Sequence, residues 1–253
     1  MCFKIAVAGK GGNGKTSIAS LIIRYLKNNK LTPILAVDAD ANANLGDSLG
    51  LSVEETVGSM LDTFNTEKLN IPPGITKEAY LEVKLNETIV ESEGIDLITM
   101  GRGEGAGCYC YPNTVLKKFI DDLMANYAYM VMDNEAGMEH LSRKTTENID
   151  ELLLISDHSV KGIRTVARIR DMVSKLGLVV KRQSVILNRV PETIDPRITE
   201  ELEKLGIKPA ATIPLDEEIY EYDLKQKPLL ELPDSSRAVQ AVSSLMSKVL
   251  KQK

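Results

Sequence analysis

A glycine-rich loop near the N-terminus constrains the fold of this chain more than any other feature. Residues 9–17, GKGGNGKTS, directly follow the apolar run FKIAVA at 3–8 and precede an apolar helical run at 18–28. The loop satisfies the pattern G-x-x-x-x-G-K-[ST], which between a strand and a helix indicates a phosphate-binding loop. Its glycines let backbone N–H groups approach a polyphosphate, and the start of the following helix favours anions. The sequence therefore predicts a strand, a phosphate-binding loop and a helix in that order.

Short apolar runs recur along the rest of the chain. They lie at 33–38, 95–100, 129–133, 152–156, 184–188 and 210–214. These runs do not alternate apolar with polar residues, so both faces of each strand should be covered, as in a parallel sheet between helices. Segments with helical periodicity, such as 160–177, separate several of them. The order of elements predicts a doubly wound α/β fold with a mostly parallel sheet and helices on both faces.

The length of the chain suits one large domain, although length alone also permits two. Its 253 residues, 43% of them hydrophobic, are enough to bury a substantial core. The segment 51–94 is the least regular part, because helical stretches flank the breaker IPPGI at 71–75. We interpret residues 1–253 as a single domain in which 51–94 is an inserted helical segment.

Charge and cysteine content restrict the surroundings in which the chain works. Lys plus Arg number 31 and Asp plus Glu number 36, a net charge of −5 that offers no general attraction for nucleic acid or an anionic membrane. We find neither a leader pattern nor an apolar run near the roughly 18 residues of a membrane span. The final helical segment, 238–253, is predicted to pack on the core rather than to anchor the chain. The odd number of cysteines, three, indicates reduced thiols and a cytoplasmic location.

The phosphate-binding loop supplies the first group of candidate site residues. Lys15 is expected to neutralise the β and γ phosphates, and the Thr16 hydroxyl to ligate Mg²⁺. The residues predicted to bind nucleotide through the loop are Gly9, Gly11, Gly12, Asn13, Gly14, Lys15, Thr16 and Ser17.

A second lysine, Lys10, stands directly after the first glycine, and with it the loop resembles the deviant P-loop of the MinD/ParA and nitrogenase-iron-protein class of dimeric ATPases. In that class this lysine crosses the dimer interface to the nucleotide of the partner. The resemblance therefore implies a homodimer that binds ATP or ADP, with Lys10 as a catalytic residue supplied between subunits.

Two acidic segments follow predicted strands, where they should lie beside the loop. Taken singly, an aspartate at a strand end is more often a helix cap. By resemblance, 37–50 is switch I, in which Asp40 orients or deprotonates the attacking water and Asp38 lies near the Mg²⁺ shell. The segment 132–137 resembles switch II, in which Asp133 holds Mg²⁺ through water and Gly137 senses the γ-phosphate.

Two further positions are predicted to contact the base. By resemblance, the amide of Asn188 in LNRV contacts adenine, and the segment 213–229, which includes Pro214, closes over it.

The segment GAGCYCYP places Cys108 and Cys110 one residue apart. In an extended segment their side chains share a face with Cα atoms about 6.5 to 7 Å apart, which is awkward for a disulfide. One chain supplies two thiolates, whereas closed sites commonly take four ligands, and a two-fold dimer would bring two pairs together. A buried, inert pair is the alternative from the residues alone.

Together, 100–119 and 132–143 look like the nickel-insertion accessory ATPases of carbon monoxide dehydrogenase and acetyl-CoA synthase, the CooC and AcsF type. That resemblance implies that Cys108 and Cys110 of two subunits bind Ni²⁺, and that ATP hydrolysis is coupled to its delivery into an apo-enzyme. The chain departs from the usual pattern at Asn13, Ala41 and Asn134, none of which removes a charge or a metal ligand.

Several alternatives stay open at this point. Thiolate softness also allows Zn²⁺ or Cu⁺, and the sequence does not separate the two client enzymes. A positioning ATPase that switches affinity for a membrane or DNA is a second hypothesis, disfavoured by the negative charge. A redox protein with an interfacial iron–sulfur cluster is a third, disfavoured because both cysteines lie in one loop.

Overall fold

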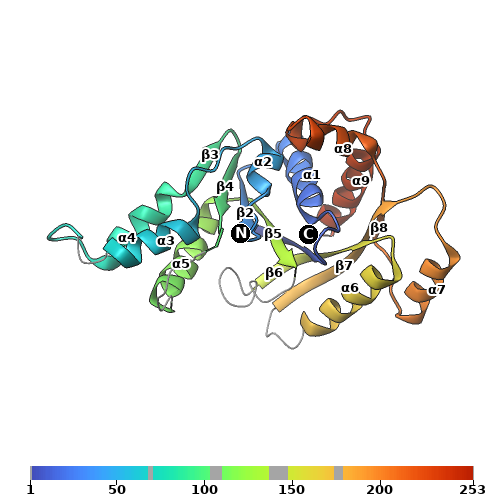
Figure 1. Ribbon diagram of the computed structural model, residues 1–253, viewed down its shortest axis with the longest axis horizontal. Coiled ribbons are helices and arrows are strands. Elements are labelled where there is room, and N and C mark those ends of the chain that lie inside the picture. The colour runs from blue at the N-terminus through green and yellow to red at the C-terminus, as the bar shows by residue number, and fades with distance from the viewer. Residues whose placement is uncertain (1, 68–70, 103–109, 137–147, 174–178, 253) are drawn as a thin grey trace.

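The computed structural model describes residues 2–67, 71–102, 110–136, 148–173 and 179–252 (Figure 1). The strands are β1 Phe3–Gly9, β2 Ile34–Ala39, β3 Ile89–Ser92, β4 Ile95–Thr99, β5 Tyr129–Ala136, β6 Asn148–Asp157, β7 Val179–Val190 and β8 Ala211–Pro214. The helices are α1 Lys15–Asn28, α2 Leu45–Leu49, α3 Val57–Glu67, α4 Lys77–Glu87, α5 Cys110–Leu123, α6 Val160–Val173, α7 Pro196–Lys204, α8 Glu217–Leu224 and α9 Arg237–Lys251, with short 3-10 turns η1 Met124–Asn126 and η3 Leu229–Glu231.

The strands form one 8-stranded sheet in the order β3-β4-β2-β5-β1-β6-β7-β8. Every neighbouring pair is parallel except β3 and β4. The chain builds outward from β1 to β2 and β4, returns to β5 beside β1, and then builds the other half through β6, β7 and β8. Reversals of this kind open a crevice at the carboxyl ends of the central strands. The predicted doubly wound, mostly parallel α/β fold is confirmed.

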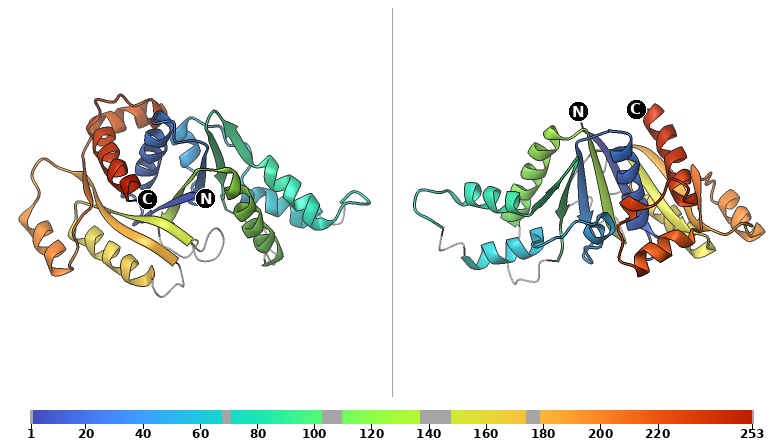
Figure 2. Two further views of the ribbon diagram at one scale, coloured as in Figure 1. Left: turned by 180° about the vertical axis from the view of Figure 1, so that it is seen from behind. Right: turned by 90° about the horizontal axis from the view of Figure 1, so that it is seen from above.

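Helices cover both faces of the sheet and create two hydrophobic cores. One core joins the sheet to α1, α2 and α9, and the other joins it to α3, α4, α5, α6 and α7. Figure 2 shows α1 and α9 side by side on one face, with α6 on the opposite face. All residues of β2 are buried, which is why its run of apolar residues shows no alternation.

The segment 51–94 differs in part from its prediction. Helices α3 and α4 fulfil the helical expectation, but the segment ends in strand β3, which the sequence analysis did not predict. Ser92 pairs with Ile95, so Glu93 and Gly94 form a two-residue hairpin turn in which Gly94 adopts a positive φ of 78°. Such turns favour glycine, and the β-branched Ile89 and Val90 suit an edge strand.

The C-terminal helix α9 packs on the core, as predicted. Its buried side chains recur at helical spacing: Val239, Val242, Leu245, Met246 and Val249. Within the described ranges, no helix combines the length and apolar character that crossing a membrane requires.

Candidate functional site

The phosphate-binding loop lies between the end of β1 and the start of α1. Gly9 has a φ of 156°, and a side chain there would collide with the carbonyl of Ile155 on β6. Gly14 precedes the first residue of α1 with a φ of 83°, and a side chain there would collide with the amide of Asn188. Glycine is therefore required at both positions, because neighbouring strands approach closely and because the backbone has a positive φ.

The buried Asn13 ties the loop to the sheet. Its backbone N–H donates to the carbonyl of Lys10 at 3.3 Å, and its side-chain amide donates to the carbonyl of Ile155 at 3.3 Å. Its own carbonyl accepts a hydrogen bond of 2.9 Å from Nδ2 of Asn188. An asparagine at this position thus holds the loop with a side-chain hydrogen bond of its own.

Thr16, Asp38 and Asp133 come together beside the loop, as the sequence predicted. Asp133 on β5 pairs in register with Asp38 on β2, and the Thr16 hydroxyl donates to Oδ2 of Asp133 at 2.5 Å. The other oxygen of Asp133, Oδ1, is buried and has no hydrogen-bond partner among the described residues. A hydroxyl and an unsatisfied carboxylate oxygen are ligands that Mg²⁺ or its bound water prefers, so this pair fits the cation.

Burial raises the pKa of both aspartates. The pKa of Asp133 rises to about 7, chiefly through desolvation and then through repulsion from Asp38, although Thr16 and Lys15 lower it. The pKa of Asp38 rises to about 6 for the same first reason, while the backbone N–H groups of Leu45 and Asp40 lower it. A cation bound at this end of the sheet would stabilise the charged forms of these two buried carboxylates.

The side chain of Asp38 also organises the segment 37–50, which we expect to be switch I. Its Oδ1 accepts from the backbone N–H of Asp40 at 3.0 Å, and its Oδ2 from that of Leu45 at 2.8 Å. Asp40 in turn accepts two hydrogen bonds of 2.9 Å from Asn42 through Oδ1. Asp38 therefore fixes the backbone at the start of α2, and Asn42 fixes the orientation of the Asp40 carboxylate.

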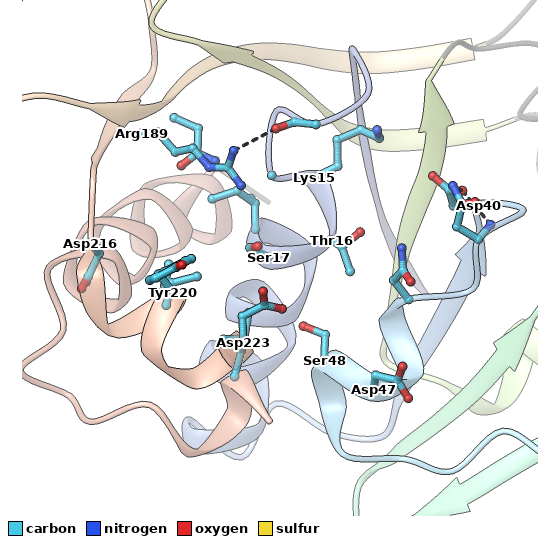
Figure 3. Close-up of a pocket in the computed structure, with 18 of the residues that line it drawn as sticks. Lys15, Thr16, Ser17, Asp40, Asp47, Ser48, Arg189, Asp216, Tyr220 and Asp223 are labelled. Carbon is cyan, nitrogen blue, oxygen red and sulfur yellow. Dashed lines mark hydrogen bonds between the residues drawn. The ribbon is translucent and has the colours of Figure 1, made fainter. Parts of the chain in front are cut away.

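A cavity of about 1380 Å³ extends from the loop between switch I and α8 (Figure 3). The predicted residues that line it are Gly11, Gly12, Gly14, Lys15, Thr16, Ser17, Asp40, Asn188 and Pro214. Gly9 and Asn13 support the loop from behind. Lys10 is half-buried and is not among the lining residues.

Several lining residues were not singled out individually, although four of them lie in the predicted segments 37–50 and 213–229. Asp47 and Ser48 of α2 face Tyr220 and Asp223 of α8 across the cavity, as Figure 3 shows. Arg189, next to Asn188, has a φ of 55° and donates from Nη1 to the carbonyl of Gly12 at 3.0 Å. Nothing in the sequence marks an arginine for this backbone conformation, although its neighbour Asn188 was already a candidate.

The cysteine pair falls largely outside the described residues. Cys108 lies outside them, as does Gly137, while Cys110 is the first residue of α5 and its side chain is not described. Cys2 is a half-buried thiol at the start of β1. In the ranges that the structure describes, no three or more His, Cys, Asp and Glu side chains are grouped to hold a metal.

Comparison with known proteins places the site in context. The model of the CobQ/CobB/MinD/ParA nucleotide binding domain matches residues 4–229. The uncharacterized ATP-binding protein MJ0685 of Methanocaldococcus jannaschii is 41% identical over 251 residues, which cover 98% of this chain and 99% of that protein. The carbon monoxide dehydrogenase accessory protein CooC of Rhodospirillum rubrum is 28% identical over 203 residues, 76% of each chain. The structure of the cell division ATPase MinD of Pyrococcus furiosus superposes with a TM-score of 0.69 at 22% identity, covers all of both chains and shows the same fold.

Proposed function

We propose that this chain, which belongs to the CobQ/CobB/MinD/ParA nucleotide-binding family, is a dimeric ATPase. In this proposal it uses ATP hydrolysis to deliver Ni²⁺ to an apo-enzyme. The client would be carbon monoxide dehydrogenase or acetyl-CoA synthase, and Ni²⁺ is the cargo, for which Zn²⁺ could substitute. The proposal has a nucleotide half and a metal half, which rest on different observations.

The contact between Thr16 and Asp133 supports the nucleotide half. We assign Mg²⁺ to Thr16 and to the unsatisfied oxygen of Asp133, with Asp38 in the surrounding shell. When bound, Mg²⁺ would neutralise charge on the β and γ phosphates. In the same proposal the buried Lys15 binds those phosphates from the loop, and Asp40, held by Asn42, orients the attacking water.

Asn188 and Pro214 stay our proposed contacts to the base. Both line the cavity, and their strands β7 and β8 lie on the opposite side of β1 from β2, which precedes Asp40. The amide of Asn188 uses one donor for the carbonyl of Asn13, so a contact to adenine would use its other donor or its oxygen.

One backbone hydrogen bond carries the metal half of the proposal. The N–H of Met100, where the segment leading to the cysteines begins, donates to the carbonyl of Asp38 at 2.8 Å. The carbonyl of Met100 accepts from the N–H of Gly58 on α3 at 2.8 Å. In this proposal, a movement of the backbone at Asp38 would be passed through this bond to Met100, from which the chain leads to Cys108 and Cys110. The 28% identity to a protein named as a carbon monoxide dehydrogenase accessory protein supports the same assignment.

Two single variants should separate the halves. We expect Cys108→Ala to lose Ni²⁺ binding but keep ATP binding, and Lys15→Ala to do the reverse, as measured by equilibrium dialysis and by titration with a fluorescent ATP analogue. Cys2→Ala is the matched control, because it removes the thiol that directly precedes β1 and leaves Cys108 and Cys110 in the chain. Equal metal stoichiometry in wild type and Cys108→Ala would refute the metal half alone.

The competing functions give different results with the same protein. Pelleting with liposomes or DNA that requires ATP but no metal would favour a positioning ATPase. A brown protein with a redox-active cluster after anaerobic purification would favour the iron–sulfur alternative.

A further inference from the structure

The end of β7 holds an arginine in a conformation that arginine rarely adopts. Arg189 has a φ of 55°, and the register between β7 and β8 shifts between Leu187 and Val190, on either side of it. A left-handed backbone is unfavourable for a residue with a long side chain, and it persists only where the surroundings fix it. The chain therefore keeps a strained residue at the edge of the nucleotide cavity.

The strained backbone lets two consecutive residues bind two consecutive carbonyls of the phosphate-binding loop. Nη1 of Arg189 donates to the carbonyl of Gly12 at 3.0 Å, and Nδ2 of Asn188 donates to the carbonyl of Asn13 at 2.9 Å. Side chains of adjacent residues in a regular strand point to opposite faces, so a regular β7 could not present both to one loop. Figure 3 shows the guanidinium of Arg189 directed at the loop.

Holding these carbonyls determines where the loop directs its N–H groups. A peptide unit is planar and trans, so fixing a C=O also fixes the opposed N–H of the next residue. The bond to the Gly12 carbonyl sets the N–H of Asn13, which donates to the carbonyl of Lys10. The bond to the Asn13 carbonyl sets the peptide whose N–H belongs to Gly14, a residue that lines the cavity.

We propose that Arg189 is a positioning residue that, together with Asn188, holds the phosphate-binding loop in the shape that receives a polyphosphate. The guanidinium acts through the Gly12 carbonyl, and the left-handed backbone is retained because it aims the side chain there. This inference rests on the ATP-binding half of the proposed function.

The test uses one variant that relieves the strain and one that keeps the donor. Arg189→Gly removes the side chain but suits a positive φ, so its Tm should stay within about 3 °C of wild type. Loss of a hydrogen bond from a charged donor should weaken ATP binding about tenfold. Arg189→Lys retains a cationic donor and should recover most of that affinity.

Lys30→Gly is the matched control. Lys30 has a φ of 58° and an exposed, positively charged side chain at the far end of α1. The change therefore removes the same charge and the same kind of strain without reaching the loop. Its ATP affinity should equal that of wild type, and its Tm should change as little as that of Arg189→Gly.

Hydrogen exchange of the peptide that covers residues 9–17, measured without nucleotide, provides a readout independent of ATP binding. Arg189→Gly should exchange these amides faster than wild type, whereas Lys30→Gly should not.

Unchanged exchange and affinity in Arg189→Gly would overturn the inference, as would a fall in affinity accompanied by a large fall in Tm. Failure of Arg189→Lys to recover affinity would also overturn it, because a cationic donor at this position would then not be enough to hold the loop. If wild type binds no ATP while the exchange result holds, the proposed function fails and the positioning role stands.

Discussion

The buried carboxylates of Asp38 and Asp133 suit a cation site, but burying their negative charge lowers the stability of the folded protein. Both are buried, and desolvation is the main reason that the pKa of each is raised; Asp38 raises the pKa of Asp133 further by repulsion. A carboxyl whose pKa is raised by folding holds its proton more tightly in the folded state than in the unfolded state. Its contribution to stability is therefore fully present below the unfolded pKa and is lost as pH rises through the folded pKa, here between about 4 and 7 for Asp133.

Asp133→Asn should accordingly stabilise the protein in the absence of Mg²⁺ and nucleotide. At pH 8 we expect the free energy of unfolding to rise by about 1–2 kcal/mol, because a buried charge is removed while an oxygen remains to accept from Thr16. At pH 5 the difference should shrink. Urea unfolding at both pH values measures this, and a variant less stable than wild type at pH 8 would contradict the raised pKa. The same variant should lose Mg²⁺-dependent hydrolysis.

Local sequence motifs predicted which residues lie at the loop and at the strand ends beside it. They did not predict a residue such as Arg189, whose backbone conformation is set by the tertiary fold. Gly14, Lys15 and Thr16 follow from a pattern of eight residues, and Asp133 from its place at a strand end. Arg189 could not be predicted, because its left-handed backbone arises from the shift between β7 and β8. The bond from Asn188 to the loop was likewise missed, because it joins residues 175 positions apart.

Helix α4 shows how the inserted segment is tied to the rest of the chain. Leu81 is fully buried in the core that also contains Ile98 of β4 and Phe119 of α5. Lys118 of α5 pairs with Glu78 of α4 at 3.2 Å, but both side chains are exposed, so this pair adds little. Apolar packing is what joins the segment to the sheet.

Leu81→Ala should therefore lower the stability of the whole chain. We expect a loss of about 3 kcal/mol with one cooperative transition and an unchanged m-value, because we propose that residues 51–94 belong to a single domain. Val83→Ala on the same helix is the control, since Val83 is 56% exposed and its truncation should change stability by less than about 0.5 kcal/mol. A separate early transition in Leu81→Ala, monitored by circular dichroism, would show that the segment folds as its own unit.

The elements themselves were predictable to different degrees. Seven strands contain the predicted apolar runs, and the signal is most continuous where a strand is buried on both faces, as in β2. Strand β3 was missed because it is short, lies at the edge and follows a helix directly, so the sequence analysis included it in the inserted helical segment 51–94.

The arrangement of the whole molecule brings the two lysines of the loop into different surroundings. Lys15 lines the cavity of its own chain, whereas Lys10 is not among the lining residues. This difference supports our proposal that Lys10 serves the nucleotide of a partner in a two-fold dimer.

Mixing two inactive variants tests that proposal. In a mixed dimer of Lys10→Ala and Asp40→Asn, one site combines an intact Asp40 with Lys10 from the other chain. Random assortment should restore about a quarter of wild-type ATPase activity. No activity above that of the separate variants would show that Lys10 acts within its own chain.

The central claim is that two chains share one Ni²⁺ in a dimer that also binds ATP. The most direct measurement is native mass spectrometry during an anaerobic Ni²⁺ titration, with and without ATP, on Asp40→Asn to prevent hydrolysis. The account predicts a dimer with one Ni²⁺ and two ATP molecules, which Cys108→Ala cannot form. One Ni²⁺ bound per monomer, with the same mass of the protein–metal species whether or not ATP is added, would contradict it.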